Sequence, residues 1–488
     1  MAQAKGKSLK INMVLNGIKG LMSVLFPLIS FPYISKILQV DNVGRYNFSN
    51  SIISYFVLLA GLGISTYAIR EGARIRHNKH EFQTFANEIF SINVVSTIAS
   101  YILLIVCIIL VPKFYVYKSL LIILSLQVIF KTIGIEWIYS IYEDYAYITI
   151  RSIAFQIISL ALMFLLIRTP SDVNMYALIT VISSVGSNVL NYFHAKHYCK
   201  VHITKNMNWK NHIKPILILF AMSVTIMIYV SSDITLLGFI KNDYNVGLYS
   251  VSVKVYTIVK TILSSVLVVS IPRLSMLLGK GKKAEFNSVA ADIYKTLLSV
   301  LLPAIVGIIL LRKEIVLIIS DSTYIEATTS LLLLSIAMFF SMGAWFWGQC
   351  ILVPLKKERI VFKATIASAV LNIVLNFVLI PIWAENAAAF TTILAEGLAY
   401  FWCMIEGRKY TSIDSMLRIS LKIICGCIGI VVVARVLSLF NMGMLIYTIA
   451  LIVISVICYT IIEIALKNEA QYGILKKLIN KIHKSSKS

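Results

Sequence analysis

Runs of apolar residues, separated by short charged or turn-forming segments, fill almost the whole chain. Each run is about 20 residues or longer, the length that an α-helix needs to cross the hydrocarbon core of a bilayer. The runs predict fourteen membrane-spanning helices, at residues 12–37, 46–69, 86–111, 115–139, 147–168, 173–195, 215–239, 247–271, 287–311, 327–353, 359–381, 385–406, 418–438 and 442–466. No segment between these runs is long enough for a separate soluble domain. The pattern therefore predicts an all-α polytopic membrane protein.

The composition agrees with this pattern. Of the 488 residues, 59% are hydrophobic and 14% are charged, whereas soluble globular proteins have about 45–50% apolar and about 25% charged residues. The formal net charge of +23 has a simple cause here, because lysine and arginine concentrate in cytoplasmic loops. With the N-terminus in the cytoplasm, the cytoplasmic segments hold 30 of the 45 basic residues, the external segments hold eight, and the spans hold the remaining seven. We therefore expect both termini in the cytoplasm and no nucleic-acid partner.

Two segments of the chain repeat at a constant spacing. Asn-Val-Gly-Arg-Tyr at 42–46 precedes the second span, and Asn-Val-Gly-Leu-Tyr at 245–249 precedes the eighth. Arg70 and Arg273, at the far ends of these two spans, are also 203 residues apart. Six spans separate the two units, so we predict two six-helix lobes in parallel duplication, with a transport site at the interface between the halves. The expected ranges are 1–200 and 201–408 for the lobes, 409–466 for two appended spans, and 467–488 for a basic amphipathic cytoplasmic tail.

Polar side chains recur on one face of four predicted spans, at the spacing of an α-helix. They are Asn12, Asn16, Lys19, Ser23 and Ser30 in the first span; Asn47, Asn50, Ser51 and Ser54 in the second; Thr225, Tyr229 and Asp233 in the seventh; and Ser250, Lys254, Thr257, Lys260, Thr261 and Ser264 in the eighth. An ionised side chain near the bilayer centre costs about 2.5–3.5 kcal/mol. These faces should therefore line a shared, hydrated cavity.

Three lysines give this predicted cavity a positive charge. Lys19, Lys254 and Lys260 would attract anions such as phosphate, and an ammonium suits a mobile diphosphate because it demands no bidentate geometry. We predict a substrate-binding set of Asn16, Lys19, Asn47, Asn50, Lys254 and Lys260. The alternative is that these lysines only extend toward the membrane surface or anchor their helices, and Lys260 is the least able to do so because it lies nearest the midplane.

Two acidic residues could couple transport to an ion gradient. Asp233 lies among the cavity lysines, and Glu396 lies near the middle of the twelfth span. A buried carboxylate with a raised pKa could carry a proton, although a structural ion pair or hydrogen bond is at least as available an explanation. We expect no cofactor and no metal site. The driving force would be an ion gradient or the membrane potential, and the sequence does not decide between proton and sodium.

Several segments resemble the polysaccharide flippases, a family within the multidrug/oligosaccharidyl-lipid/polysaccharide exporter superfamily. The similarity lies in Pro-Leu-Ile-Ser-Phe-Pro-Tyr-Ile-Ser-Lys-Ile-Leu at 27–38, Gly-Leu-Gly-Ile-Ser-Thr-Tyr-Ala-Ile-Arg-Glu at 61–71, and Glu-Trp-Ile-Tyr-Ser-Ile-Tyr-Glu at 136–143 with Arg151. The resemblance implies two six-helix lobes, a cationic central cavity and alternating access. It also implies a bacterial cytoplasmic (inner) membrane location.

From this resemblance we expect a flippase for undecaprenyl-diphosphate-linked oligosaccharide repeat units of O-antigen, capsule or a related surface polysaccharide. Its partners would be that lipid-linked oligosaccharide, the bilayer, and the polysaccharide polymerase and chain-length machinery. Three other functions stay open. A multidrug/cation antiporter of the same fold should carry acids rather than three lysines in its cavity, and a membrane enzyme should carry a large external catalytic loop. A non-transporting scaffold would not need aligned charged faces.

Overall fold

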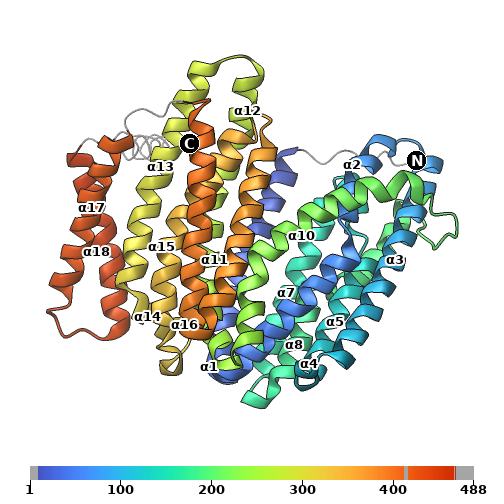
Figure 1. Ribbon diagram of the computed structural model, residues 1–488, viewed down its shortest axis with the longest axis horizontal. Helices are drawn as coiled ribbons and strands as arrows, with labels where there is room; N and C mark the ends of the chain where they lie inside the picture. The colour runs from blue at the N-terminus through green and yellow to red at the C-terminus, as the bar shows by residue number, and fades with distance from the viewer. Residues whose placement is uncertain (1–8, 412–415, 467, 469–488) are drawn as a thin grey trace, which may run out of the picture. The chain divides into compact units, whose positions relative to one another are not determined.

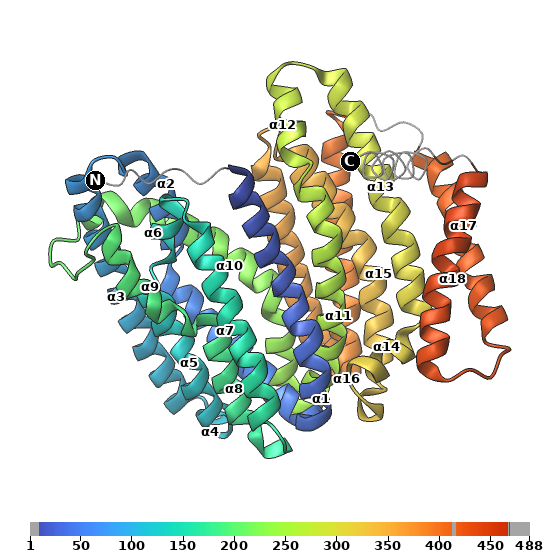
Figure 2. The same ribbon diagram turned by 180° about the vertical axis from the view of Figure 1, so that it is seen from behind.

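The computed structural model describes residues 9–411, 416–466 and 468 (Figures 1 and 2). In these residues every regular element is a helix, and eleven helical stretches are long and apolar enough to cross a membrane. The predicted all-α polytopic architecture is thereby confirmed, and the chain is a multi-pass membrane protein. The count of fourteen spans stays a prediction, because two of the long stretches contain a break and α5 has only 16 residues. The predicted tail at 467–488 lies, apart from Asn468, outside the described residues.

The chain forms two compact units, Met1–Gly247 and Leu248–Ser488. The first unit contains α1 (Leu9–Gly61), α2 (Ile64–Ile75), α3 (Lys79–Leu110), α4 (Pro112–Val116), α5 (Lys118–Ile133), α6 (Glu136–Ile141), α7 (Tyr145–Leu166), η1 (Pro170–Asp172), α8 (Val173–Val181), the π-helix η2 (Ile182–Gly186), α9 (Asn188–His194), η3 (Ala195–His197), α10 (Trp209–Ile240) and the first turn of α11 (Asp243–Val268). Its core is built by α1, which packs against α3, α5, α7 and α10.

The second unit contains the rest of α11, then α12 (Ile271–Gly279), α13 (Lys283–Leu310), α14 (Arg312–Ile319), η4 (Ser322–Tyr324), α15 (Ala327–Trp345), the π-helix η5 (Phe346–Leu352), α16 (Glu358–Arg408), α17 (Met416–Leu437) and α18 (Met444–Ala465). Here α15 packs along α16, and α17 packs along α18 and α13. These units do not coincide with the predicted ranges, since α10 packs on α1 and α2 although its span was assigned to the second lobe. The duplicated lobes stay a prediction from the sequence.

Both very long helices are broken at one residue. In α1, Gln39 has φ 63° and ψ 174°, and in α16, Ala384 has φ 48° and ψ −128°. Residues other than glycine rarely adopt such backbone angles, so contacts with the surrounding residues must hold Gln39 and Ala384 in these conformations. Near Gln39, the Tyr33 hydroxyl donates to the carbonyl of Ile167 at 2.8 Å, and the Asn42 amide donates to the carbonyl of Pro170 at 2.8 Å. The breaks fall between the predicted spans 12–37 and 46–69, and between 359–381 and 385–406.

A buried polar network joins the two arms of α16. The Thr391 hydroxyl donates to Asn376 Oδ1 at 2.6 Å, and the Asn376 amide donates to Asn372 Oδ1 at 3.0 Å. All three residues are at most 3% exposed. Buried amides need such partners, because an unpaired one would cost about 1–3 kcal/mol. The network therefore fixes how the arms before and after Ala384 pack on each other.

Small residues allow very close helix contacts in both units. A Cβ atom placed on Gly44 of α1 would lie 1.8 Å from the carbonyl oxygen of Asp243, and one on Gly247 would lie 2.2 Å from that of Val40. In α17, a Cβ on Gly426 or Gly429 would meet the side chains of α18 at 2.7 or 2.4 Å. Figures 1 and 2 show α17 and α18 side by side over their whole length. Glycine is the residue that lets two membrane helices approach this closely.

Candidate functional site

A charged cluster in the second unit centres on the buried Glu396 carboxylate. Its Oε1 atom accepts hydrogen bonds from the Ser341 hydroxyl at 2.8 Å, the Tyr256 hydroxyl at 3.3 Å and the Lys260 ammonium at 3.3 Å. Lys260 Nζ also lies 3.3 Å from the Tyr256 hydroxyl oxygen and 5.3 Å from the centre of the Tyr256 ring. We call these four residues the Lys260 cluster.

Three helices position the Lys260 cluster. Tyr256 and Lys260 are four residues apart on α11 and therefore share one face of the helix. Ser341 comes from α15, and Glu396 comes from the second arm of α16 between the small residues Ala395 and Gly397. The hydroxyls of Tyr256 and Ser341 and the ammonium of Lys260 reach the carboxylate directly.

The cluster holds a charge pair with unequal access to the outside. The Lys260 side chain is 31% exposed, whereas that of Glu396 is 7% exposed. The carboxylate is thus held by the fold, while the ammonium at its side can still be reached. Such a pair can exchange partners: an incoming anion can compete with Glu396 for the ammonium, and a proton or cation can then compensate the carboxylate.

The structure brings together two of the residues predicted from the sequence, Lys260 and Glu396. The predicted cavity lysine Lys254 lies on another side of α11. Lys254 lies on α11 six residues before Lys260, which places it about 120° around the helix. It is half-buried and takes no part in the bonds of the Lys260 cluster described above. The predicted roles of Lys260, Glu396 and Lys254 stay predictions.

The predicted polar residues of the first unit lie on the two arms of α1 and on α10. Asn50 Oδ1 accepts a hydrogen bond from the Gln127 amide of α5 at 3.2 Å, and Asn47 donates to the Val43 carbonyl of its own helix at 2.8 Å. The Thr235 hydroxyl of α10 contacts the Ser51 hydroxyl at 3.0 Å. Asp233 lies two residues before Thr235 and is half-buried. The side chains of Asn16 and Lys19, in the first arm of α1, lie outside the described part of the structure.

A buried contact between a histidine and a glutamate was not predicted from the sequence. His212 Nε2 of α10 lies 2.9 Å from Glu88 Oε2 of α3, and His212 Nδ1 lies 2.8 Å from the Tyr67 hydroxyl of α2. The three residues are 9% exposed or less. They tie three helices together at the end of the first unit that is predicted to be cytoplasmic. No spacing signal could have revealed a pair whose members are 124 residues apart.

Glu136 and Arg151, noticed only within the resemblance, form a third charged group. Arg151 Nη2 lies 3.3 Å from Glu136 Oε1, and Arg151 Nη1 donates to the Ser187 carbonyl at 3.0 Å. Ser187 directly follows the π-helix η2, and a π-turn leaves backbone carbonyls that need other donors. Arg151 supplies one, so its role in the structure is to hold the irregular turn between α8 and α9.

Comparison with known proteins identifies the family of the chain. The family model described as "Polysaccharide biosynthesis protein" matches residues 9–278. An Escherichia coli (strain K12) protein named as an O-antigen transporter is 21% identical over 80% of this chain and 94% of its own length. The Staphylococcus aureus capsular polysaccharide biosynthesis protein CapF is 22% identical over 74% of this chain and 89% of its own length.

Solved structures give the same picture for the fold. The lipid II flippase MurJ in an inward closed conformation superposes with a TM-score of 0.75 and 15% identity, over 94% of this chain and 99% of MurJ. An inward-facing multidrug resistance MATE family transporter of the MOP superfamily gives a TM-score of 0.60 and 11% identity, over 84% and 98% of the two chains. These proteins are named as flippases and transporters, not as enzymes. The family model matches more than half of the 488 residues of this chain. The chain therefore belongs to the polysaccharide biosynthesis protein family.

Proposed function

We propose that the protein is a flippase that moves undecaprenyl-diphosphate-linked oligosaccharide repeat units, of O-antigen, capsule or a related surface polysaccharide, across the bacterial cytoplasmic membrane. Both termini lie in the cytoplasm in this proposal. Membership of the family and the flippase and transporter names of the relatives support the reaction class. The translocated unit is passed on to the polysaccharide polymerase and chain-length machinery.

The observation that carries the proposal for this chain is the Lys260 cluster. The reachable Lys260 ammonium is a binding group for the diphosphate of the lipid carrier, and Glu396 is the group that releases it. When the diphosphate takes the ammonium, Glu396 loses its counter-charge and takes up a proton or a cation from the membrane gradient. The exchange keeps the buried charge balanced in each state of an alternating-access cycle, which avoids the cost of an isolated ion in the membrane.

A complementation assay tests this function. Lys260→Gln should abolish surface polysaccharide in a flippase-deficient strain, whereas the matched control Lys313→Gln, at an exposed lysine of α14, should restore it fully. Protein in the membrane is measured in parallel. Lys260→Arg should keep part of the activity, because charge matters more than geometry for a mobile diphosphate. Full complementation by a stable Lys260→Gln variant would contradict the proposed role of the cluster.

The competing function is a multidrug/cation antiporter, which the MATE-like fold and the buried Glu396 would allow. The two functions differ in their response to Lys260. An antiporter for cationic drugs should gain or keep transport when this positive charge is removed, while a flippase for an anionic lipid carrier should lose it. Drug-resistance and polysaccharide assays on the same Lys260→Gln strain therefore separate them.

A further inference from the structure

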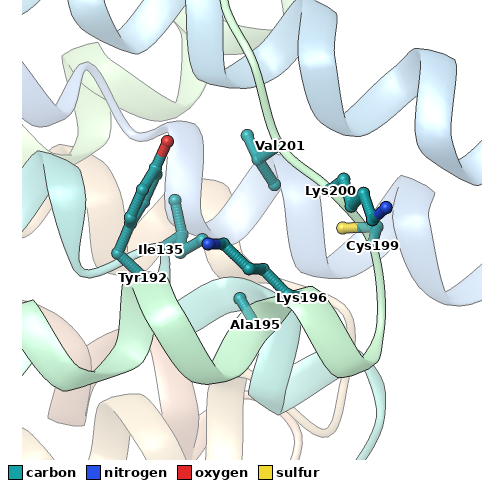
Figure 3. A pocket seen from close by; sticks show the side chains of 7 residues that line it. All are labelled: Ile135, Tyr192, Ala195, Lys196, Cys199, Lys200 and Val201. Atoms are coloured by element: carbon teal, nitrogen blue, oxygen red, sulfur yellow. The ribbon is translucent and has the colours of Figure 1, made fainter.

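Two pockets meet at the side chain of Tyr192, at the end of the first unit that is predicted to be cytoplasmic. One, of about 370 Å3, is lined on its polar side by Tyr192, Lys196 and Lys200 and is shown in Figure 3. The other, of about 590 Å3, is mostly apolar and is lined among others by Phe130, Ile133, Phe193 and Ile203. We call them the basic pocket and the apolar groove. Tyr192 lines both, so the two pockets are neighbours, and we treat them together as one surface.

A ladder of polar residues on α3 fixes the loop that closes the basic pocket. Gln83 bonds to both the backbone N–H and the carbonyl of Lys200, at 3.0 and 2.7 Å. Asn87 Oδ1 accepts from the backbone N–H of His202 at 3.0 Å, and Ser91 Oγ accepts from that of Thr204 at 2.8 Å. The three residues recur every four positions along α3 and thus lie on one face. The 200–204 loop is therefore held in place along α3.

The polar groups of the basic pocket have unused binding capacity. Among the described residues, neither the Lys196 nor the Lys200 ammonium pairs with a carboxylate, and the Tyr192 hydroxyl makes no hydrogen bond. In Figure 3 the Lys196 side chain extends across the pocket toward Tyr192 and Ile135, while the Lys200 ammonium lies on the Cys199 side. Two cations and a free donor suit a phosphate. No carboxylate of the described residues neutralises these two lysines.

The apolar groove opens to the outside of the protein. Phe193 and Ile203 at its edge are 60% and 63% exposed. At the membrane interface such exposed apolar side chains insert into the boundary between headgroups and acyl chains. The groove is thus a surface for an acyl chain, directly beside a surface for a phosphate.

We propose that this surface binds an anionic phospholipid of the surrounding bilayer, with its phosphate between Lys196, Lys200 and Tyr192 and one acyl chain in the apolar groove. Basic pockets at the cytoplasmic face of helix bundles have the chemistry for such headgroups. The site is separate from the Lys260 cluster, and its occupation does not depend on the proposed flippase activity. A bound lipid would brace the 200–204 loop against α9 and α3.

Native mass spectrometry of the full-length protein in detergent tests the site. The protein is titrated with palmitoyl-oleoyl phosphatidylglycerol and, separately, with phosphatidylcholine of the same chains. The double variant K196Q/K200Q should bind phosphatidylglycerol about 30-fold more weakly, from about fivefold per lysine. Its binding of phosphatidylcholine should change much less, because the choline ammonium offsets the charge of the phosphate. The matched control K205Q/K210Q removes two exposed lysines of the same basic segment outside the pocket and should bind both lipids as the wild type does. Ile203→Ser should weaken the binding of both lipids several-fold.

The outcomes separate the possible occupants. Equal losses in the two double variants would show diffuse attraction to a basic surface, and unchanged binding in K196Q/K200Q would show that there is no site; either result overturns the proposal. Displacement of phosphatidylglycerol by inorganic phosphate alone would show that the groove contributes nothing, and displacement only by an isoprenyl diphosphate would make the carrier lipid the occupant. If K196Q/K200Q does not elute as a folded protein in size exclusion, Lys196→Gln alone should show the fivefold loss, and its absence would overturn the proposal.

Discussion

Lys260 of α11 and Glu396 of α16, 136 residues apart in the chain, form one ion pair with 3.3 Å between Nζ and Oε1. The sequence presents the lysine as an anion-binding group and the glutamate as an ion carrier, with no link between them. Their contact means that neither charge can change its state without affecting the other. Any account of substrate binding at Lys260 must therefore include Glu396.

This coupling should be visible in stability. Lys260→Gln leaves the Glu396 carboxylate buried without its ammonium; removal of one partner from a fully buried pair costs about 3–5 kcal/mol. Because the Lys260 side chain is 31% exposed, solvent screening reduces this to about 2 kcal/mol. The double variant K260Q/E396Q should recover most of that loss without recovering transport. Denaturation of the wild type, the two single variants and the double variant in detergent measures the free energy of unfolding of each. Strictly additive losses of this free energy would show that the pair is not coupled.

The Tyr67–His212–Glu88 contact should stabilise the first unit. His212→Leu removes the contacts of His212 with Tyr67 and Glu88 and leaves the buried Glu88 carboxylate without its partner. This should lower the free energy of unfolding by about 3 kcal/mol. Tyr67→Phe removes one hydrogen bond and should cost about 1 kcal/mol. His80→Ala, at an exposed position of α3, serves as the control and should be neutral. Thermal unfolding of the purified proteins measures these differences. Equal midpoint temperatures for all three variants would contradict the stabilising role of this contact.

Gly44 should tolerate no larger side chain. In Gly44→Ala the new Cβ would lie 1.8 Å from the backbone oxygen of Asp243, and backbone cannot move aside cheaply. We expect loss of folded protein from the membrane fraction. Gly307→Ala is the matched control within α13, because a Cβ there meets nothing within 4 Å, and it should be neutral or stabilise by up to about 1 kcal/mol through helix propensity. Normal expression of Gly44→Ala would show that α1 and the start of α11 do not pack this closely.

The Cys199 thiol should be nearly unreactive in the folded protein. Burial raises the pKa of Cys199 to about 12 from an ordinary value of 9.0. The reactive form is the thiolate, so at pH 8 its fraction falls by about 1000-fold, and the labelling rate should rise about tenfold per pH unit until the pH approaches that pKa. Maleimide labelling of a variant with Cys199 as its sole cysteine measures this.

The same assay tests the ladder on α3. Q83A/N87A removes the side chains that hold the 200–204 loop and should speed labelling of Cys199 many-fold at constant pH. Thr84→Ala is the control, because the Thr84 hydroxyl bonds only to the carbonyl of its own helix at His80. Labelling of wild-type protein at the rate of an ordinary exposed thiol would contradict the buried position of Cys199.

The sequence was sufficient for what depends on local pattern. Hydrophobic length predicted the helices, and the breaks at Gln39 and Ala384 lie in the intervals between predicted spans. The i, i+4 spacing of Tyr256 and Lys260 could also have placed the tyrosine beside the lysine, although the tyrosine was not selected. Periodicity was not sufficient for the π-helices η2 and η5, because nothing in the sequence marks the wider turns that they form.

Contacts between distant residues could not be predicted in this way. Glu88 and His212 are 124 residues apart, and neither one's neighbours in the sequence indicate the other, yet the two side chains form a buried contact. Glu396 stood alone among small residues, and nothing in its own span indicates Lys260 or Ser341 as partners. Which helix faces meet is set by packing of the whole unit, and a single sequence carries no direct record of it.

The single-residue breaks in α1 and α16 also determine where the protein can be handled. A chain that passes from one apolar helix to the next through Gln39 or Ala384 alone offers no loop to a protease, an antibody or an inserted epitope. An insertion there would have to unwind helix on both sides. Between α17 and α18, in contrast, six residues from Ser438 to Gly443 lie outside the helices, and Leu439 is 83% exposed. An epitope tag for following the protein therefore belongs in that turn.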